Sequence, residues 1–199
     1  SATRQSSLLP QVFCDMGITL SVPGNHAFDD GQEAFARKWA DSDYLPRRWD
    51  FRYVCANMRC KGRIPDSCQP WAVVPVPIGD GDTVKVAVTG LITANTPYQA
   101  SARKVAGLEF DARYDAVLDS LEHLPGYSEV AEADVHVLAT HITAYNLNGK
   151  PVFDDPGQDA LYSLDRDDID AIVAAHSHSK LAGYIQCGRP YPIVQAYWH

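Results

Sequence analysis

The sequence predicts a mixed α/β fold, because short apolar runs typical of strands alternate with amphipathic stretches typical of helices. A turn rich in glycine and aspartate, residues 79–82, joins two of these runs and indicates a hairpin. Hydrophobic residues make up 46% of the 199 residues, enough to bury the core of one domain or a large part of one. We therefore treat residues 1–199 as part of one domain, with no second domain.

The helices and strands follow from the spacing of the apolar residues and from the turn residues between them. Gly17 is typical of a residue that ends a helix, and Pro125-Gly126 ends another. The expected helices span 7–16, 31–41 and 111–124. The expected strands span 18–22, 53–56, 71–78, 84–92, 135–139, 169–174 and 193–196, with polar loops over 95–105 and 145–157.

The net charge is −8, with 25 acidic and 17 basic residues. Such a surface does not favour non-specific binding of nucleic acid, which depends on basic patches. An acidic protein can still bind an anionic phosphate substrate when bound cations dominate the local field. No apolar run approaches the ~18–20 residues that span a bilayer, so no membrane span is expected.

No two cysteines have the CxxC spacing, so a structural zinc site is not expected. Cys60 and Cys68 lie near each other in a loop-like region, so a local disulfide is expected if the protein is exported. The alternative is that all the cysteines are free or buried thiols, and the sequence does not choose between the two. The five cysteines are Cys14, Cys55, Cys60, Cys68 and Cys187.

Three of the apolar strands end in a polar cluster that contains histidine. Ligands of α/β sheets bind beyond the carboxyl ends of strands, so three such ends can meet at one site. Imidazole and amide oxygen both serve as ligands for divalent metals. For the last cluster alone, a polar loop with two solvated histidines is an equally good interpretation. The clusters are Asn25-His26, Thr140-His141 and His176-Ser177-His178.

Asp29 lies three residues after His26, a spacing that can place its carboxylate against the imidazole at the start of a helix. A carboxylate there favours the imidazolium, which suits a site where a phosphoryl group develops charge or a leaving oxygen needs a proton. The alternative is a helix-capping aspartate beside a polar histidine. Gly24 is expected to free the backbone to turn before this segment.

These motifs, taken in order, resemble the 5'-nucleotidase branch of the calcineurin-like metallophosphoesterases. The resemblance covers roughly residues 17–196. Residues 24–31 are similar to that branch's GNHEFDxG block, and 90–93 to its GLTT-like strand end. Thr140-His141 resembles the next metal histidine, and 175–178 resembles the GHxH block.

The resemblance implies a four-layer α-β-β-α sandwich and a hydrolase that uses two divalent metal ions, such as Zn or Mn. The two ions, ~3.5–4 Å apart, would clamp the phosphate and activate a bridging water. His26 would be catalytic, stabilising the transition state and assisting the leaving group, and Asp29 would orient it. The implied ligands are Asn25, His141 and His176 for one ion and His178 for the other.

Three features depart from the family's pattern. Its DxH and GD blocks have no counterpart before Gly17, so we expect a catalytic domain that is incomplete at its N-terminus and that could be inactive by itself. Ala27 stands where the family has a Glu that is not needed as a ligand. Ala175 stands where the family has a Gly that often serves a turn. Asn57 is expected to hold a turn, with substrate binding as the weaker alternative.

The implied reaction is hydrolysis of phosphate esters, above all nucleotide 5'-monophosphates, so the expected partner is a small-molecule phosphate ester. A 2',3'-cyclic nucleotide or a sulfur-bearing ester suits the same metal core and remains an alternative. A non-catalytic remnant or binding module, which kept the fold and lost the first metal segment, is the alternative from another class. Family habit and the cysteine count favour an extracellular or periplasmic protein, although no signal peptide is present; the oligomeric state stays open.

Overall fold

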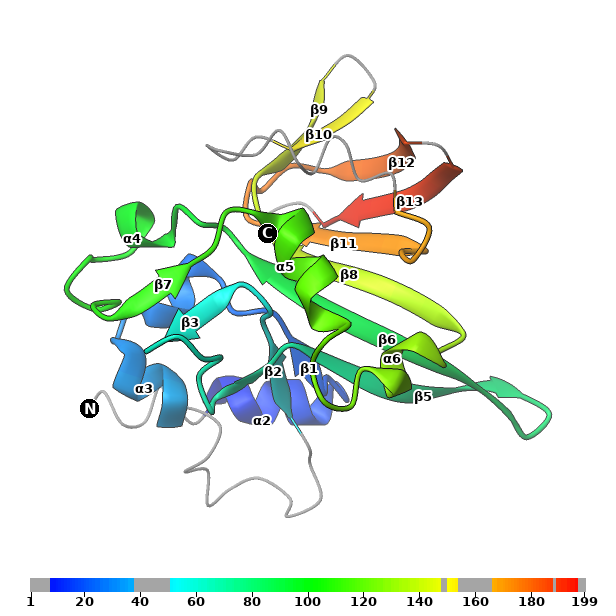
Figure 1. The fold of residues 1–199 in the computed structure, drawn as a ribbon, viewed down its shortest axis with the longest axis horizontal. Coiled ribbons are helices and arrows are strands. Elements are labelled where there is room, and N and C mark those ends of the chain that lie inside the picture. Colours follow the sequence, from blue (N-terminus) through cyan, green and yellow to red (C-terminus); the bar gives the residue numbers. More distant parts are fainter. Residues whose placement is uncertain (1–7, 38–50, 148–149, 154–165, 188, 197–199) are drawn as a thin grey trace.

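The computed structural model describes residues 8–37, 51–147, 150–153, 166–187 and 189–196. Strands alternate with short helices along these residues, so the mixed α/β class predicted from the sequence is confirmed. The main parts, visible in Figure 1, are a six-stranded sheet and a smaller three-stranded sheet.

The six-stranded sheet is mixed. Its four inner strands run parallel, and each edge strand runs antiparallel to its neighbour. This arrangement puts the carboxyl ends of four strands on one edge, which is where α/β folds place their ligands. In spatial order the strands are β12 (Leu181–Cys187), β13 (Arg189–Gln195), β11 (Ala171–Ala175), β8 (Val135–His141), β6 (Asp82–Ile92) and β5 (Trp71–Gly79).

The three-stranded sheet is parallel and meets the larger sheet at Gly90 of β6. The backbone N–H of Ala56 donates to the Gly90 carbonyl over 2.7 Å. A Cβ added at Gly90 would stand 1.9 Å from the carbonyl oxygen of Val54, so only glycine allows this approach. The sheet has the order β1 (Leu20–Ser21), β2 (Arg52–Val54) and β4 (Cys68–Gln69).

Short helices flank both sheets, and none of the described helices is long and apolar enough to cross a membrane. Gly17, with φ 71°, follows the first helix as predicted. Figure 1 shows α5 lying across the six-stranded sheet, while α2 and α3 lie beside the smaller one. The helices are α2 (Leu8–Asp15), η1 (Asn25–Phe28), α3 (Gln32–Arg37), α4 (Thr96–Gln99), α5 (Tyr114–Leu121) and α6 (Ser128–Ala131).

Two segments predicted as loops contain regular structure. The segment over 95–105 includes α4, where a proline in the first turn costs no hydrogen bond. The segment over 145–157 includes most of an antiparallel hairpin, while 154–157 lie outside the described residues. Its strands carry polar residues and a proline, so their composition gave no strand signal. Six described strands were not predicted: β4, β12, β9 (Ala144–Leu147) and β10 (Lys150–Phe153), which pair, and β3 (Met58–Cys60) and β7 (Leu108–Phe110), which pair.

Two hydrophobic clusters fill the fold. The first lies between α5 and the six-stranded sheet and includes Tyr114, Val117, Leu121, Leu138, Ile172 and Ile193. The second surrounds the smaller sheet. There the rings of Phe28 and Phe35 lie 4.9 Å apart, and Phe35 lies 4.8 Å from Tyr53. Full burial of Phe28 stabilises the fold by about 1.5–3 kcal/mol relative to exposure, which anchors η1.

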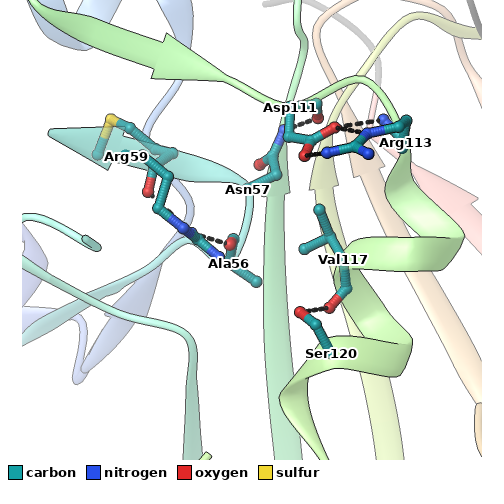
Figure 2. A network of polar contacts seen from close by, with 8 residues as sticks. Ala56, Asn57, Arg59, Asp111, Arg113, Val117 and Ser120 are labelled. Atoms are coloured by element: carbon teal, nitrogen blue, oxygen red, sulfur yellow. Dashed lines mark hydrogen bonds and ion pairs between the residues drawn. The ribbon is translucent and has the colours of Figure 1, made fainter. Parts of the chain in front are cut away.

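Asn57 is a fully buried amide bonded to backbone groups. Its Nδ2 donates to the carbonyls of Ile92 (2.7 Å) and Asp111 (3.0 Å), and its Oδ1 accepts from the Ile92 N–H (2.9 Å). Figure 2 shows Asn57 facing Asp111, whose carboxylate binds Arg113. These bonds use both amide hydrogens and join the end of β6 to the segment that follows β7.

Four cysteines are described as free, namely Cys14, Cys55, Cys60 and Cys68. The structure therefore contains no Cys60–Cys68 disulfide, and the free-thiol alternative applies to these residues. Burial raises the pKa of the Cys68 thiol to about 12. Burial, with a smaller contribution from Cys68, raises the pKa of Cys55 further above its ordinary value. Both thiols stay protonated at neutral pH, so neither is a reactive nucleophile.

Gly90→Ala is expected to destabilise the fold by about 1–3 kcal/mol, because the new methyl group meets backbone atoms of Val54 that cannot rotate away. The midpoint of urea unfolding measures the change. Thr83→Ala, at an exposed position of the same strand, is the control and should change stability by less than about 0.5 kcal/mol. Equal stability of the two variants would show that the packing of the two sheets does not require the close approach of Gly90 to Val54.

Candidate metal centre

The carboxyl ends of the parallel strands meet at one edge of the six-stranded sheet. β8 runs on to His141, two residues beyond the predicted strand. There His141 pairs with Ile92, the last residue of β6, and with Ala175, the last residue of β11. The segment after β1 reaches the same point, because Gly24 and Asn25 lie against the His141 ring. The three histidine-containing strand ends therefore lie together, as the sequence predicts.

Three of the predicted ligands are in contact. Oδ1 of Asn25 lies 3.0 Å from Nε2 of His141, and Nδ1 of His176 lies 3.1 Å from the same nitrogen. Tetrahedral zinc bound to nitrogen at ~2.0–2.1 Å keeps its ligand atoms ~3.3 Å apart. Both distances to Nε2 of His141 are thus close to the spacing of two ligand atoms on one cation, although the three residues come from η1, β8 and the turn after β11.

The hydrogen bonds of this cluster conflict with one another. Nε2 of Gln99 lies 3.1 Å from Nε2 of His176. If the Gln99 N–H donates to Nε2 of His176, that histidine carries its proton on Nδ1, and this N–H donates to Nε2 of His141. Nε2 of His141 then has no proton, so its lone pair faces the lone pair of Oδ1 of Asn25. If the amide is turned, one proton on His141 must serve both Asn25 and His176. A divalent cation accepts all three lone pairs and removes the conflict, so these residues fit one.

Gly24 provides space for the His141 ring. Its backbone is extended, with φ −96° and ψ 172°, which any residue adopts. A Cβ at this position would stand 2.6 Å from Cε1 and 2.7 Å from Nε2 of His141. The expectation that Gly24 is needed for backbone freedom is therefore wrong. Glycine is needed there because the imidazole packs directly on the main chain.

His141 is set up to bind a cation rather than a proton. Burial, together with the charges of His176, His26 and His178, lowers the pKa of His141 to about 4. His141 is therefore neutral at pH 7 and keeps a lone pair for a metal. The same effect shows that the other three imidazoles lie within electrostatic range of His141.

His26 and Asp29 form the pair that their spacing predicts. Nδ1 of His26 lies 2.9 Å from Oδ2 of Asp29. The contact arises because η1 is a 3₁₀ turn, in which residues three apart eclipse each other. The side chains are 75% and 60% exposed, so the pair adds little to stability. Lys104 donates to the Asp29 carbonyl and ties this turn to the loop after α4.

The turn after β11 holds two residues in the left-handed region. His176 has φ 94° and His178 has φ 54°, which non-glycine residues rarely adopt. Ala175, which replaces the family's glycine, is not among the residues with positive φ. The alanine is therefore accommodated, and the unusual backbone falls on the two histidines instead.

The described residues contain no group of three or more His, Cys, Asp or Glu side chains that could hold a metal ion. The cluster around His141 reaches three ligands only because Asn25 adds an amide oxygen. Asn25 is itself 7% exposed, so its side chain is held inside the site. Two imidazoles and one amide oxygen suit a divalent transition metal such as Zn or Mn.

Two glutamines at this edge are absent from the sequence prediction. Gln99 of α4 approaches His176, and Gln195 of β13 donates to Ser177 and Ser179 in the turn after β11. Neither belongs to a motif. The available signal for Gln195 was a polar residue that directly follows the apolar end of a strand, and for Gln99 there was none.

No family profile matches the sequence. Among curated proteins, the endonuclease YhcR of Bacillus subtilis (strain 168) is 27% identical over 192 residues. The match covers 93% of this chain and 15% of that protein, so the chain spans a small part of this relative's length.

Solved structures match nearly all of the chain. A putative 5'-nucleotidase from Staphylococcus aureus has a TM-score of 0.66 at 20% identity, covering 96% of this chain and 34% of that protein. The calcineurin-like phosphoesterase YfkN from Bacillus subtilis has a TM-score of 0.67 at 16% identity, covering 95% and 57%. The resemblance found in the motifs is thus confirmed in three dimensions: this chain has the fold of the calcineurin-like phosphoesterases and 5'-nucleotidases over part of their length.

Proposed function

We propose that this chain is part of the catalytic domain of a metal-dependent phosphoesterase of the 5'-nucleotidase kind, built as a four-layer α-β-β-α sandwich. The convergence of Asn25, His141 and His176 from three separate elements carries the proposal. The likeness in fold to a putative 5'-nucleotidase and a phosphoesterase supports the reaction class. The proposed substrate is a small phosphate ester.

In this proposal Asn25, His141 and His176 bind one divalent cation through Oδ1, Nε2 and Nδ1, and His178 binds a second. When bound, such cations would act as Lewis acids that polarise phosphoryl oxygens and make a water molecule more acidic. His141 gives its lone pair without first losing a proton. His176 carries its proton on Nε2. With the Gln99 amide rotated so that Oε1 faces His176, this N–H donates to Oε1 and holds the His176 ring in place.

His26 acts on the substrate rather than on a cation. Asp29 accepts the Nδ1–H of His26, which orients the ring. Nε2 is then the nitrogen that donates to a phosphoryl oxygen or protonates the leaving alkoxide. Ala27, at the position of the family's Glu, packs against the second hydrophobic cluster and takes no part.

Nucleotide 5'-monophosphates are the first substrates to test, and 2',3'-cyclic nucleotides and sulfur-bearing esters are the alternatives. The curated relative is named an endonuclease, so single-stranded DNA belongs in the same assay. A binding module without catalysis is the candidate from another class. It would bind the cation but turn over none of these substrates.

His141→Ala is expected to remove one bound Mn²⁺, because His141 is the ligand that contacts both of the others. Dialysis against Mn²⁺ followed by elemental analysis measures the stoichiometry, and the unsubstituted chain should hold at least one equivalent. His123→Ala, at an exposed position after α5, is the matched control and should keep the full content. Equal Mn²⁺ in the His141 variant and the unsubstituted chain, or none in either, would contradict the proposal.

In a protein that carries this chain together with the DxH and GD blocks, His26→Ala is expected to lower kcat for a nucleotide 5'-monophosphate by about 10²–10⁴-fold, the usual contribution of a general acid. The Mn²⁺ content should not change, because Nδ1 of His26 binds Asp29 and not the cluster. Release of phosphate and elemental analysis are measured on the same samples. Loss of Mn²⁺ would make His26 a ligand, and an unchanged kcat would remove it from the mechanism.

Gly24→Ala is expected to weaken Mn²⁺ binding by about 10–100-fold, the usual effect of disturbing the surroundings of a metal ligand. The methyl group would overlap the His141 ring and push Nε2 away from Asn25. Isothermal titration with Mn²⁺ gives the affinity, and Ser21→Ala, in β1, is the control. Unaltered affinity would show that the ring moves aside without consequence.

A further inference from the structure

One buried amide supports the turn that follows β11. This is the amide of Gln195, a residue that is 4% exposed at the end of β13. Its Nε2 donates to Oγ of Ser177 and to the carbonyl of Ser179, both over 2.8 Å. A carbonyl can only accept, so the second bond fixes which way the amide faces. The Ser177 hydroxyl in turn donates to the carbonyl of Ala144.

These bonds run across the carboxyl edge of the sheet. Gln195 pairs with Leu181, the first residue of β12, and its strand also pairs with β11. Ala144 begins β9, shortly after β8 ends at His141. The turn is therefore tied to the strands on both of its sides and to the segment that follows the central ligand. Its backbone cannot relax without breaking these hydrogen bonds.

The residues held in this way are interleaved with the strained ones. Ser177 lies between His176 and His178, whose φ angles of 94° and 54° are in the left-handed region. Non-glycine residues persist there only where the surrounding structure over-determines the backbone. The bonds from Gln195 to Ser177 and Ser179 hold the turn at two points, one between the two histidines and one directly after His178.

Stability alone does not account for a glutamine at this position. Oε1 of Gln195 is buried and accepts no hydrogen bond from the described part of the chain, which is unfavourable. An apolar residue such as the neighbouring Ile193, which is fully buried, would avoid that cost. A buried polar group kept at a cost is typical of a functional constraint.

We propose that Gln195, acting through Ser177, is a positioning residue for divalent-cation binding: it holds the left-handed backbone that presents His176 and His178 to the site. Gln195 touches neither the cation nor the substrate. The proposal rests on the proposed function, because it takes the two histidines as ligands.

Gln195→Met tests the proposal, since methionine keeps the length of the side chain and removes both N–H donors. Isothermal titration with Mn²⁺ should give about 10–100-fold weaker binding than the unsubstituted chain. Ile193→Val is the matched control: it removes a buried methyl group from the same strand and should leave the affinity unchanged. Equal affinities for the two variants would overturn the proposal.

Ser177→Ala provides a second variant in case Gln195→Met does not fold. It should weaken Mn²⁺ binding to a similar extent. The double variant should bind no more weakly than the weaker single variant, because both substitutions break the same chain of bonds. Losses that multiply in the double variant would overturn the link between the two residues.

A metal-free measurement separates this proposal from the proposed function. The backbone ¹³C chemical shifts of His176 and His178 report their φ angles in the absence of any cation. We expect left-handed values in the unsubstituted chain and in Ile193→Val, and averaged values in Gln195→Met. If the unsubstituted chain binds no Mn²⁺, the proposed function fails, yet altered shifts still support the role of Gln195 and unaltered shifts refute it.

Discussion

The close approach of the small sheet to β6 determines where the candidate site forms. Gly90 lets the backbone of β2 lie directly on β6, and Gly24 lets the His141 ring lie directly on the segment that follows β1. In both places a Cβ would overlap its neighbour, so the constraint is volume rather than backbone freedom. Because β1 pairs with β2, the first contact brings the second within reach. Asn25 consequently meets a histidine more than a hundred residues away in the sequence.

Two buried amides hold the irregular backbone that the sheets cannot hold by themselves. Asn57 bonds to both backbone groups of Ile92 at the end of β6, and Gln195 bonds to the turn after β11. Each amide forms hydrogen bonds with backbone or hydroxyl groups that have little access to water. Leaving such a group without a hydrogen bond costs about 1–3 kcal/mol. The carboxyl edge of the sheet is thus rigid on either side of His141, which favours a preorganised site.

The electrostatics of the site resolve a difficulty posed by the composition. A chain with a net charge of −8 repels an anionic substrate over long range. The candidate centre is nevertheless lined by imidazoles, and burial lowers the pKa of His141, so this residue is neutral and keeps a lone pair for a cation. Bound cations would then supply the local positive field that a phosphate needs. His26 and Asp29 remain exposed at the rim, where a substrate can reach them.

The α/β class and the hairpin of β5 and β6 could be predicted from the sequence, and the candidate ligands could be proposed from it. Those features depend on local apolar periodicity, turn chemistry and short motifs, all of which are written along the chain. The packed structure was needed to see why Gly24 must be glycine and that Asn57 bonds to the backbone. It was also needed to see that Cys60 and Cys68 are free thiols and that Gln99 and Gln195 lie at the site. Each of these depends on which atoms come within a few ångströms across distant strands. Steric overlap between side chains and backbone, and the need of a buried polar group for a hydrogen-bond partner, arise only when the sheets have packed together.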